Sequence, residues 1–454
     1  KPIANTDVFC FAHPEQPHLK HPRLLPPETI LQGVRKGVED GGNKSGIPTV
    51  NGSIFFDPRY RAKPLVYCGT VGISPVEING KKAYEKHTQV GDIIVMAGGR
   101  VGKDGIHGAT FSSEALHEGS PANAVQIGDP FTQKRLSDFL LVARDLGLIS
   151  GITDNGAGGL SSSIGEMAEI TGGAKINLDT VPLKYPGLLP YEIVISESQE
   201  RMSISTNQFD ALQKLAEQYQ VEITAIGEFT NSGSFDIYYH NQCVASLNLE
   251  FLHKGLPQLK LKAYWEPERL DIIVHPAPKD PNKILLNLLA HPNICSREAI
   301  IRQYDHEVQG RSVIKSLVGV AQRGPSDAAV ILVDRNQPEG LVISNGLCPQ
   351  FSDWDTYHMA CCAVDEAVRN AVAVGCDPKS ITLLDNFCWP DPVEGPRNPD
   401  AEHKMAQLVR ACKGIHDMAY AYETPFISGK DSMKNDFDDG DTRLSIPPTL
   451  LISA

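Results

Sequence analysis

The chain repeats part of itself, and this repeat restricts its fold more than any other feature of the sequence. The run Asp7-Val8-Phe9-Cys10-Phe11 returns as Asp385-Asn386-Phe387-Cys388-Trp389, at an offset of 378 residues (385 − 7). A second match, in which Lys36-Gly37-Val38 returns as Lys413-Gly414-Ile415, has an offset of 377 (413 − 36). Two matches in one order and at nearly one spacing predict a duplicated domain, in a pseudo-symmetric protein whose site can lie between the copies. The alternative is chance similarity between two αβ segments.

The two copies differ in the length of chain that precedes them. The second copy begins near Ser296, well upstream of Asp385, whereas only six residues precede Asp7 in the first copy. The chain also ends at Ala454, directly after the strand-like run Thr449-Leu450-Leu451. We therefore expect an internal piece of a longer polypeptide, in which the first copy lacks its beginning.

Charge, hydrophobicity and cysteine spacing exclude several classes of function. The chain carries 42 Lys and Arg residues against 55 Asp and Glu residues, and its net charge of −13 disfavours binding to nucleic acid or anionic membranes. No apolar run approaches the ~20 residues of a membrane span. The ten cysteines include no CxxC pair, so we expect neither a zinc site nor a redox pair. Several lie in apolar runs, which indicates reduced core cysteines and a cytoplasmic protein.

Alternating helix-like and strand-like patterns predict a mixed α/β fold. The predicted helices are 27–41, 131–146, 161–171, 208–219, 296–304, 357–374 and 401–420. The predicted strands are 47–56, 65–72, 92–97, 148–152, 191–195, 202–206, 328–333 and 381–384, with further strands within 221–247. The segment 254–295 is rich in proline and lysine, which is typical of a linker.

A glycine-rich loop follows one of these predicted strands. It runs from Gly98 to Gly108 and contains Gly102, Lys103, Asp104 and His107. Glycines allow backbone amides to approach a phosphate, and a lysine supplies positive charge. The spacing matches neither GxGxxG nor the Walker A pattern, so an ordinary turn is the alternative.

Two further segments precede predicted helices. Asp154 opens a glycine run after a short apolar segment, at a place where an acid can hold Mg²⁺ facing a phosphate. The alternative is a turn in which Asp154 caps the helix. Gln126 lies just before Asp129, which is expected to cap the helix that begins at Phe131, and the Gln126 amide can hydrogen-bond a small polar ligand.

Two polar runs complete the candidate set. The run Glu197 to Arg201 interrupts two apolar segments, and it is either a hairpin turn or a group of side chains that converge on a ligand. In the second copy, Ser428 to Asn435 combines a glycine turn with two lysines and an acid, which suits nucleotide phosphates. A solvated hairpin is the alternative. Asp385-Asn386 is expected to lie beside this run if the second copy folds as the first does.

Five of these runs occur in one order along nearly the whole chain. They are GKDGIHGATFSS from Gly102, QIGDPF from Gln126, DNGAGGLSS from Asp154, ISESQERM from Ile195 and SGKDSMKND from Ser428. Taken together they resemble the phosphoribosylformylglycinamidine synthase family, PurL, of purine biosynthesis. Five ordered motifs are far more specific than any one of them.

The resemblance implies a domain arrangement. Enzymes of this family consist of two tandem units related to AIR synthetase, each with an N-terminal domain that contributes to a shared β-barrel and a C-terminal α/β domain. Residues 1–85 are then the remainder of the first N-terminal domain, 86–253 the first C-terminal domain, 254–295 the linker and 296–454 the second N-terminal domain. The second C-terminal domain is absent.

The resemblance also implies a reaction. ATP phosphorylates the amide oxygen of formylglycinamide ribonucleotide, after which ammonia from a glutaminase subunit or domain displaces phosphate and forms the amidine. Mg²⁺ neutralises the triphosphate, and positioning does most of the rest. The implied substrate contacts are Gln126, Glu197, Ser198, Gln199 and Ser432, the implied ATP contacts are Asp385, Asn386, Gly429 and Lys430, and the implied metal ligand is Asp154, with Asp431 as a second candidate.

Three departures limit the resemblance. The chain lacks the family's SHNHP-like histidine segment and its EHC-like segment, so the catalytic set is incomplete and has no general base. Lys430 stands where the commoner pattern has a metal-binding asparagine, and Leu383 stands where it has an ATP-contacting aspartate. Asp385 or Asp431 is therefore expected to bind the metal in place of the asparagine. No glutaminase nucleophile motif is present, and ammonia is expected from a partner or from another domain.

Two other functions stay open. One is a different ATP-dependent enzyme of the superfamily, such as AIR synthetase, selenophosphate synthetase or thiamine-phosphate kinase, although the ESQER and QIGDPF segments argue against it. The other is a nucleotide-binding half without turnover, which the missing general base favours.

Overall fold

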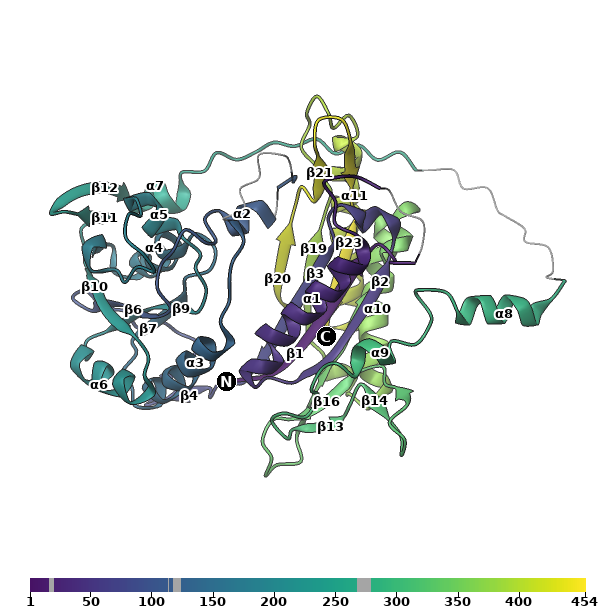
Figure 1. Cartoon of the computed structure of the whole chain (residues 1–454), viewed down its shortest axis with the longest axis horizontal. Helices are drawn as coiled ribbons and strands as arrows, with labels where there is room; N and C mark the ends of the chain where they lie inside the picture. Colours follow the sequence, from purple (N-terminus) through teal and green to yellow (C-terminus); the bar gives the residue numbers. More distant parts are fainter. Residues whose placement is uncertain (16–19, 113, 117–123, 268–278) are drawn as a thin grey trace. The chain divides into compact units, whose positions relative to one another are not determined.

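The computed structural model describes all residues except 16–19, 113, 117–123 and 268–278 (Figure 1). The chain forms two compact units. The first consists of Lys1 with residues 73–112 and 119–259, and the second of residues 2–72, 113–118 and 260–454. The second unit therefore contains both predicted copies of the repeat, whereas the boundaries proposed at 85 and 295 stay predictions.

A mixed seven-stranded sheet forms the centre of the first unit. Its strand order is β12-β11-β8-β10-β6-β9-β7. The strands are β6 (Ile93–Gly98), β7 (Gly151–Asp154), β8 (Ala174–Asn177), β9 (Arg201–Thr206), β10 (Ile223–Phe229), β11 (Ser234–Tyr239) and β12 (Gln242–Asn248). A short hairpin of β4 (Glu77–Ile78) and β5 (Lys81–Lys82) precedes them.

Helices cover both faces of this sheet, and β6 shows why. Side chains alternate along a strand, so Ile94 and Met96 pack into one core with α4 (Gly159–Thr171) and α5 (Pro190–Ile195). Val95 and Ala97 pack into another core with α3 (Pro130–Asp145) and α6 (Phe209–Tyr219). The helices are α2 (Gly108–Ser112), α3 (Pro130–Asp145), α4 (Gly159–Thr171), α5 (Pro190–Ile195), α6 (Phe209–Tyr219) and α7 (Leu249–Lys254). The predicted mixed α/β class is confirmed.

The second unit contains two copies of one strand arrangement. In each copy a central strand lies parallel to one neighbour and antiparallel to the other. Asp7 pairs with Gly52 in the first copy, and Asp385 pairs with Gly429 in the second, so the two copies share one register. The first copy consists of β1 (Pro2–Phe11), β2 (Thr49–Phe56) and β3 (Leu65–Gly72), and the second of β19 (Leu383–Cys388), β20 (Phe426–Ser432) and β23 (Thr449–Ser453). The predicted duplication is confirmed.

A helix joins the parallel strands in each copy. The first copy has α1 (Pro27–Gly41), and the second has α11 (Ala401–Tyr422), which packs against α10 (Thr356–Ala373). Gly414 makes this packing close, since a Cβ there would lie 2.6 Å from the carbonyl oxygen of Tyr357. The equivalent Gly37 of α1 has nothing within 4 Å of such a Cβ. The two helices therefore have the same position in the repeat but different surroundings.

The two sheets of the second unit share a layer of side chains. Strand β18 (Asn345–Leu347) extends the second sheet to the order β18-β23-β19-β20. Cys10 and Tyr60 of the first copy pack with Ile446 and Cys388, and the Tyr60 hydroxyl lies 2.8 Å from that of Thr449. Among the described strands no backbone ladder joins the two sheets, so the shared barrel stays a prediction.

Smaller elements complete the second unit. They are α9 (Glu298–Ile301), β13 (Ser312–Ile314), β14 (Leu317–Val318), β15 (Gly324–Pro325), β16 (Ala329–Leu332), β17 (Gly340–Ile343), β21 (Asp436–Asp438) and β22 (Arg443–Ser445). None of the helices in the described ranges is long and apolar enough to cross a membrane.

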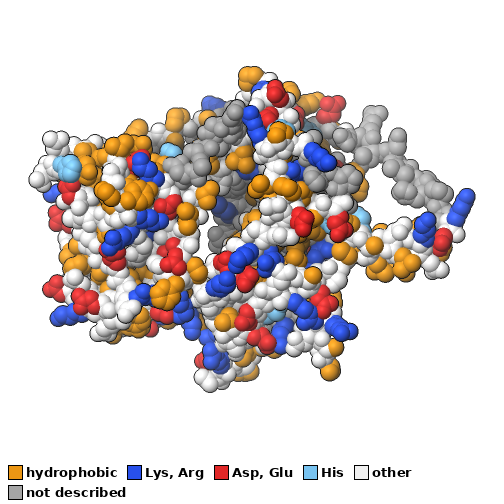
Figure 2. Space-filling view, viewed as in Figure 1, with side chains coloured by type: hydrophobic (Ala, Val, Ile, Leu, Met, Phe, Trp, Pro, Cys, Tyr) orange, Lys and Arg blue, Asp and Glu red, His pale blue; other side chains and the backbone are white. Residues whose placement is uncertain are grey.

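The predicted linker 254–295 contains ordered elements. Trp265 stacks on His403 of α11, and the guanidinium of Arg410 lies 4.6 Å from the indole ring. Further along, α8 (Pro281–Leu289) begins at Asp280, whose side chain accepts a hydrogen bond from the Lys283 amide. Apolar side chains of α8 are exposed, as the orange atoms along this helix in Figure 2 show.

Several predictions of local structure are wrong. Residues 191–195 belong to helix α5 instead of a strand, because Pro190 occupies its first turn and Glu192 bonds back to the Leu189 amide. The short strand expected at 148–152 is β7, at residues 151–154. Residues 296–304 form only one helical turn, α9. The Ser428 run is the strand β20 and not a turn or hairpin, because it pairs along β19.

Candidate functional site

Glu197 joins three segments of the first unit that are far apart in the sequence. Its carboxylate accepts hydrogen bonds from the backbone amide of Ala109 at 2.8 Å, from Gln126 Nε2 at 2.6 Å and from the backbone amide of Gly158 at 3.1 Å. The residue is only 2% exposed, and a buried carboxylate needs such donors to offset its lost hydration. The Glu197 run is therefore no hairpin turn, since it gathers the glycine loop, Gln126 and the Asp154 motif.

The serines beside Glu197 fix the same segment. Ser198 Oγ accepts a hydrogen bond from the Gly102 amide at 3.0 Å, and Ser196 Oγ donates to the Asp104 carbonyl at 3.2 Å. Gln199 Nε2 donates to the carbonyl of Glu197 at 2.8 Å. The segment is thus bound to the glycine loop through both hydroxyls.

The charged residues of the glycine loop are already paired. Lys103 Nζ lies 3.1 Å from Glu192, and Asp104 lies 2.8 Å from Lys184. Burial opposes ionisation of Asp104, but the hydrogen bonds from Lys184 and Ser198 outweigh it and lower its pKa. His107 is exposed and has a positive φ of 58° just before α2. A phosphate at this loop would therefore contact backbone amides and His107, because the lysines Lys103 and Lys184 are paired with carboxylates.

Asp154 ends β7 as an exposed carboxylate. Its Oδ2 accepts a hydrogen bond from the Gly156 amide at 2.9 Å. It does not cap α4, because Gly158 occupies that position with a φ of 77°. Within the described residues no group of three His, Cys, Asp or Glu side chains could hold a metal ion. Mg²⁺ commonly binds one or two carboxylates together with water and substrate phosphates, so an exposed single carboxylate fits it.

In the second unit, Asp385 lies against the glycine of the neighbouring strand. A Cβ on Gly429 would lie 2.6 Å from Asp385 Oδ1, so the carboxylate occupies the space that a side chain would fill. Burial raises the pKa of Asp385, and the nearby charge of Asp431 adds to this shift. The prediction that Asp385 lies beside the Ser428 run is confirmed, although Asp385 and Asn386 lie within β19 and not at its end.

The other predicted residues of the second unit lie on the paired strands β19 and β20. Asn386 pairs with Lys430, and Cys388 pairs with Ser432. Lys430 and Asp431 are exposed. Ser432 receives a 2.6 Å hydrogen bond on its carbonyl from Asn435 Nδ2. The polar groups of this motif thus lie on the outer strand of the sheet.

The first copy lacks these charged groups. Its residues after Gly52 are Ser53, Ile54 and Phe55, at the positions of Lys430, Asp431 and Ser432. Asp7 is retained, and it accepts a 3.2 Å hydrogen bond from the Thr49 hydroxyl. Burial raises the pKa of Asp7 to about 6. The two copies share an acid opposite a glycine, buried in the first copy and partly buried in the second, but only the second continues with charged side chains.

Three structurally important residues were missed from the sequence. Asn155 accepts hydrogen bonds from Ser163 and Ser203, Arg201 binds backbone carbonyls, and Asn435 holds the chain at Ser432. Each lies inside or directly beside a motif, which is the one signal that could have drawn attention to it. The acceptors of Arg201 and Asn435 are backbone carbonyls of the same motifs, whereas Ser163 and Ser203, which bond to Asn155, lie outside the Asp154 motif.

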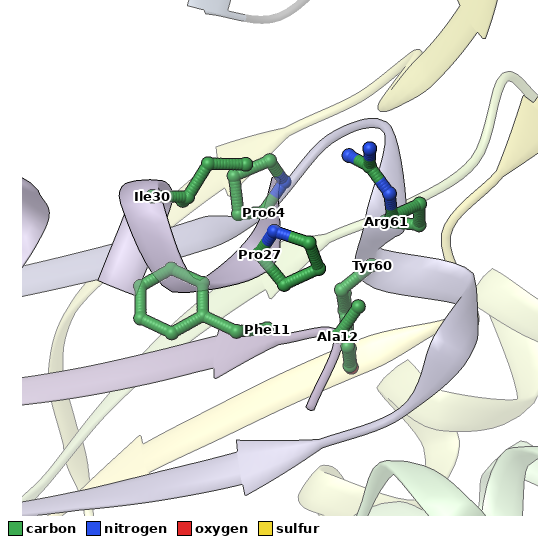
Figure 3. A pocket seen from close by; sticks show the side chains of 7 residues that line it. All are labelled: Phe11, Ala12, Pro27, Ile30, Tyr60, Arg61 and Pro64. Atoms are coloured by element: carbon green, nitrogen blue, oxygen red, sulfur yellow. The ribbon is translucent and has the colours of Figure 1, made fainter. Parts of the chain in front are cut away.

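A separate small pocket lies beside α1 (Figure 3). Phe11, Pro27, Ile30, Tyr60 and Pro64 line it. Its walls are mainly apolar, and none of the predicted site residues lines it. It is therefore not a candidate for the chemistry considered above.

Comparison with known families identifies the family of the chain. The model described as AIR synthase related protein, C-terminal domain, matches residues 89–240. The model described as AIR synthase related protein, N-terminal domain, matches residues 1–74 and 325–446. The chain belongs to the AIR synthase-related family. The N-terminal domain model matches both copies of the repeat, in agreement with their common register.

Named relatives within this family are PurL proteins. Phosphoribosylformylglycinamidine synthase subunit PurL of Picrophilus torridus is 35% identical over 449 residues, which are 96% of this chain and 57% of that protein. The structure of T. maritima PurL complexed with FGAR has 26% identity and a TM-score of 0.76, covering 100% of this chain and 66% of that one. The structure of T. maritima PurL complexed with ADP has 26% identity and a TM-score of 0.71, and the match covers 100% of this chain and 64% of that one. The resemblance to PurL is confirmed, and the chain spans little more than half of the named relative.

Proposed function

We propose that the protein containing this chain is an ATP-dependent ligase that forms formylglycinamidine ribonucleotide, ADP and phosphate from formylglycinamide ribonucleotide, ammonia and ATP. The observation that carries the proposal is the network around Glu197. Ala109, Gln126, Gly158 and Glu197 belong to four different motifs of the PurL resemblance, and all four meet at one carboxylate. The names of the relatives and the FGAR complex of T. maritima PurL support this choice of substrate.

In this proposal the first unit orients the substrate. Gln126, Glu197, Ser198 and Gln199 bind it, and Ser432 of the second unit is the further substrate contact. Glu197 already accepts three hydrogen bonds, so its main part is to order the surrounding loops. Among the described residues Gln126 gives one N–H to Glu197, which leaves its carbonyl oxygen and second N–H for the ligand. An amide with both a donor and an acceptor suits the amide group of the substrate.

The proposed nucleotide contacts are Asp385, Asn386, Gly429 and Lys430, together with the loop residues Gly102, Lys103, Asp104 and His107. The ADP complex of T. maritima PurL supports a nucleotide site. Asp154 would hold Mg²⁺, with Asp431 as the second candidate ligand. When bound, Mg²⁺ would neutralise part of the negative charge of the triphosphate. The chain's own residues hold the substrate amide and the triphosphate, and positioning of this kind supplies much of the rate enhancement in phosphoryl transfer.

Ammonia is proposed to come from a glutaminase subunit or domain. The relatives are named as a subunit, which supports a multi-subunit assembly. All ten cysteines of the chain are free thiols, which supports the proposed reducing cytoplasm.

The test is ATP hydrolysis by the complete polypeptide in ammonium, with and without formylglycinamide ribonucleotide. We expect turnover that depends on this substrate and is lost in Asp154→Ala. Asp145→Ala is the matched control, since this exposed carboxylate pairs only with its neighbour Arg144 among the described ion pairs. Turnover without substrate dependence would refute the proposal and favour another enzyme of the superfamily, and no turnover at all would favour a nucleotide-binding module.

A further inference from the structure

Arg201 is a buried cation whose hydrogen-bond acceptors among the described residues carry no formal charge. It begins β9 and is 3% exposed. Its Nε donates to the carbonyl of Ser198 at 2.7 Å, its Nη2 donates to the carbonyl of Ser196, and its Nη1 lies 3.8 Å from the Met96 sulfur. Burial lowers the pKa of Arg201 to about 10. A guanidinium without a paired carboxylate is costly to bury, so its position calls for a specific reason.

The two carbonyls that Arg201 binds flank Glu197. The Ser196 carbonyl belongs to the peptide group that joins Ser196 to Glu197, and the Ser198 carbonyl belongs to the one that joins Ser198 to Gln199. Arg201 therefore holds the backbone at both ends of Glu197-Ser198, which restricts the conformation of the segment that carries the Glu197 side chain. The planar fork of an arginine holds two oxygens from two nitrogens at a fixed spacing.

The same carbonyl groups also meet the glycine motifs. A Cβ on Gly159 would lie 2.2 Å from the Ser196 carbonyl oxygen, so the Asp154 motif packs directly on it. The Ser198 hydroxyl accepts the Gly102 amide, which ties the other glycine loop to this segment. Arg201 therefore binds the same short segment, Ser196 to Ser198, that contacts both glycine motifs.

We propose that Arg201 is a positioning residue that sets the geometry of Glu197, Ser198 and Gln199 for substrate binding. The inference rests on the proposed function, and it adds a residue that does not itself touch the substrate. Lysine at this position would keep the charge but lose the fixed spacing between two donor nitrogens. Arg201→Lys therefore separates geometry from charge, and Arg201→Met removes both.

The experiment compares these variants in the complete polypeptide with Arg100→Lys. Arg100 is an exposed arginine of the same unit and forms a bidentate pair with Glu222, so it is a matched surface control. Since a displacement of about 1 Å can cost about 100-fold, we expect kcat/KM for formylglycinamide ribonucleotide to fall between about 10-fold and 100-fold in Arg201→Lys.

A second measurement does not depend on the reaction. Hydrogen exchange at the amides of Gly102, Ala109 and Gly158 should accelerate in Arg201→Lys and not in Arg100→Lys. A lower melting temperature with unchanged substrate KM and unchanged exchange at these amides would overturn the inference. Absence of substrate-dependent turnover in the wild type would instead refute the proposed function, and the exchange data would then decide the inference alone. If Arg201→Met does not fold, Arg201→Lys carries the test.

Discussion

Replacing Glu197 by glutamine should release the loops that its carboxylate holds together. The carboxylate offers two acceptor oxygens to three N–H donors, whereas a glutamine amide offers one oxygen and an NH₂ group that cannot accept. If the remaining oxygen keeps Ala109 and Gln126, the Gly158 amide faces an N–H group and loses its partner. In the reverse orientation Ala109 and Gln126 lose theirs. At least one partly buried donor is therefore left unsatisfied in Glu197→Gln.

The magnitude follows from the cost of such a donor. An unsatisfied N–H that is partly buried costs about 1 to 2 kcal/mol, which makes local opening about 5-fold to 30-fold more frequent. Hydrogen exchange followed on peptides containing Ala109 and Gly158 measures this opening directly. Glu222→Gln is the control, because Glu222 forms an exposed pair with Arg100 that contributes at most about 1 kcal/mol. Unchanged exchange at both amides in Glu197→Gln would refute the view that this carboxylate orders the site.

Two further predictions concern the second unit. Burial raises the pKa of Asp7 from 3.8 to about 6, so the folded state retains a proton that the unfolded state releases. Stability should therefore fall as the pH rises from about 4 to about 6, by up to about 3 kcal/mol, and Asp7→Asn should flatten this part of a melting-temperature profile; an unchanged slope would contradict the assignment. Gly414→Ala should destabilise the chain by about 1 to 3 kcal/mol, because its Cβ meets the Tyr357 carbonyl at 2.6 Å and the Ala360 Cβ at 3.0 Å. Gly37→Ala has open space around the new Cβ and should stabilise the chain by up to about 1 kcal/mol. If thermal unfolding showed that both substitutions change the stability in the same direction, the packing described for Gly414 would be contradicted.

The repeat was the most reliable guide to the fold, because duplication preserves register as well as order. The pairings of Asp7 with Gly52 and of Asp385 with Gly429 follow from the same alignment of the two copies. Long periodic segments such as 357–374 were also predicted well, since α10 differs by one residue at each end. Asp129 caps α3 as expected and accepts the Phe131 amide at 3.1 Å.

The failures have a common physical origin in tertiary context. Residues 191–195 have strand-like composition, but a proline in the first turn and the bond from the Leu189 amide to Glu192 favour a helix. The glycine of the Ser428 run suggested a turn, whereas pairing with β19 holds it extended. The motifs named Glu197 and Gln126 but could not show that they bond to each other. Arg201 was not selected because its acceptors are backbone carbonyls, which carry no sequence signature.

The position of β20 has a consequence for how the protein avoids self-association. It is the outer strand of its sheet, and outer strands invite pairing with other chains unless charges interrupt them (Figure 1). Lys430 and Asp431 provide such an interruption, whereas the equivalent residues of β2 are Ser53 and Ile54. If these two residues were exchanged for those of the first copy, the strand would read Phe-Ile-Ser-Gly-Ser-Ile-Ser and would carry no charge. Lys430 and Asp431, proposed here for nucleotide and metal, are therefore also the charges that interrupt this outer strand.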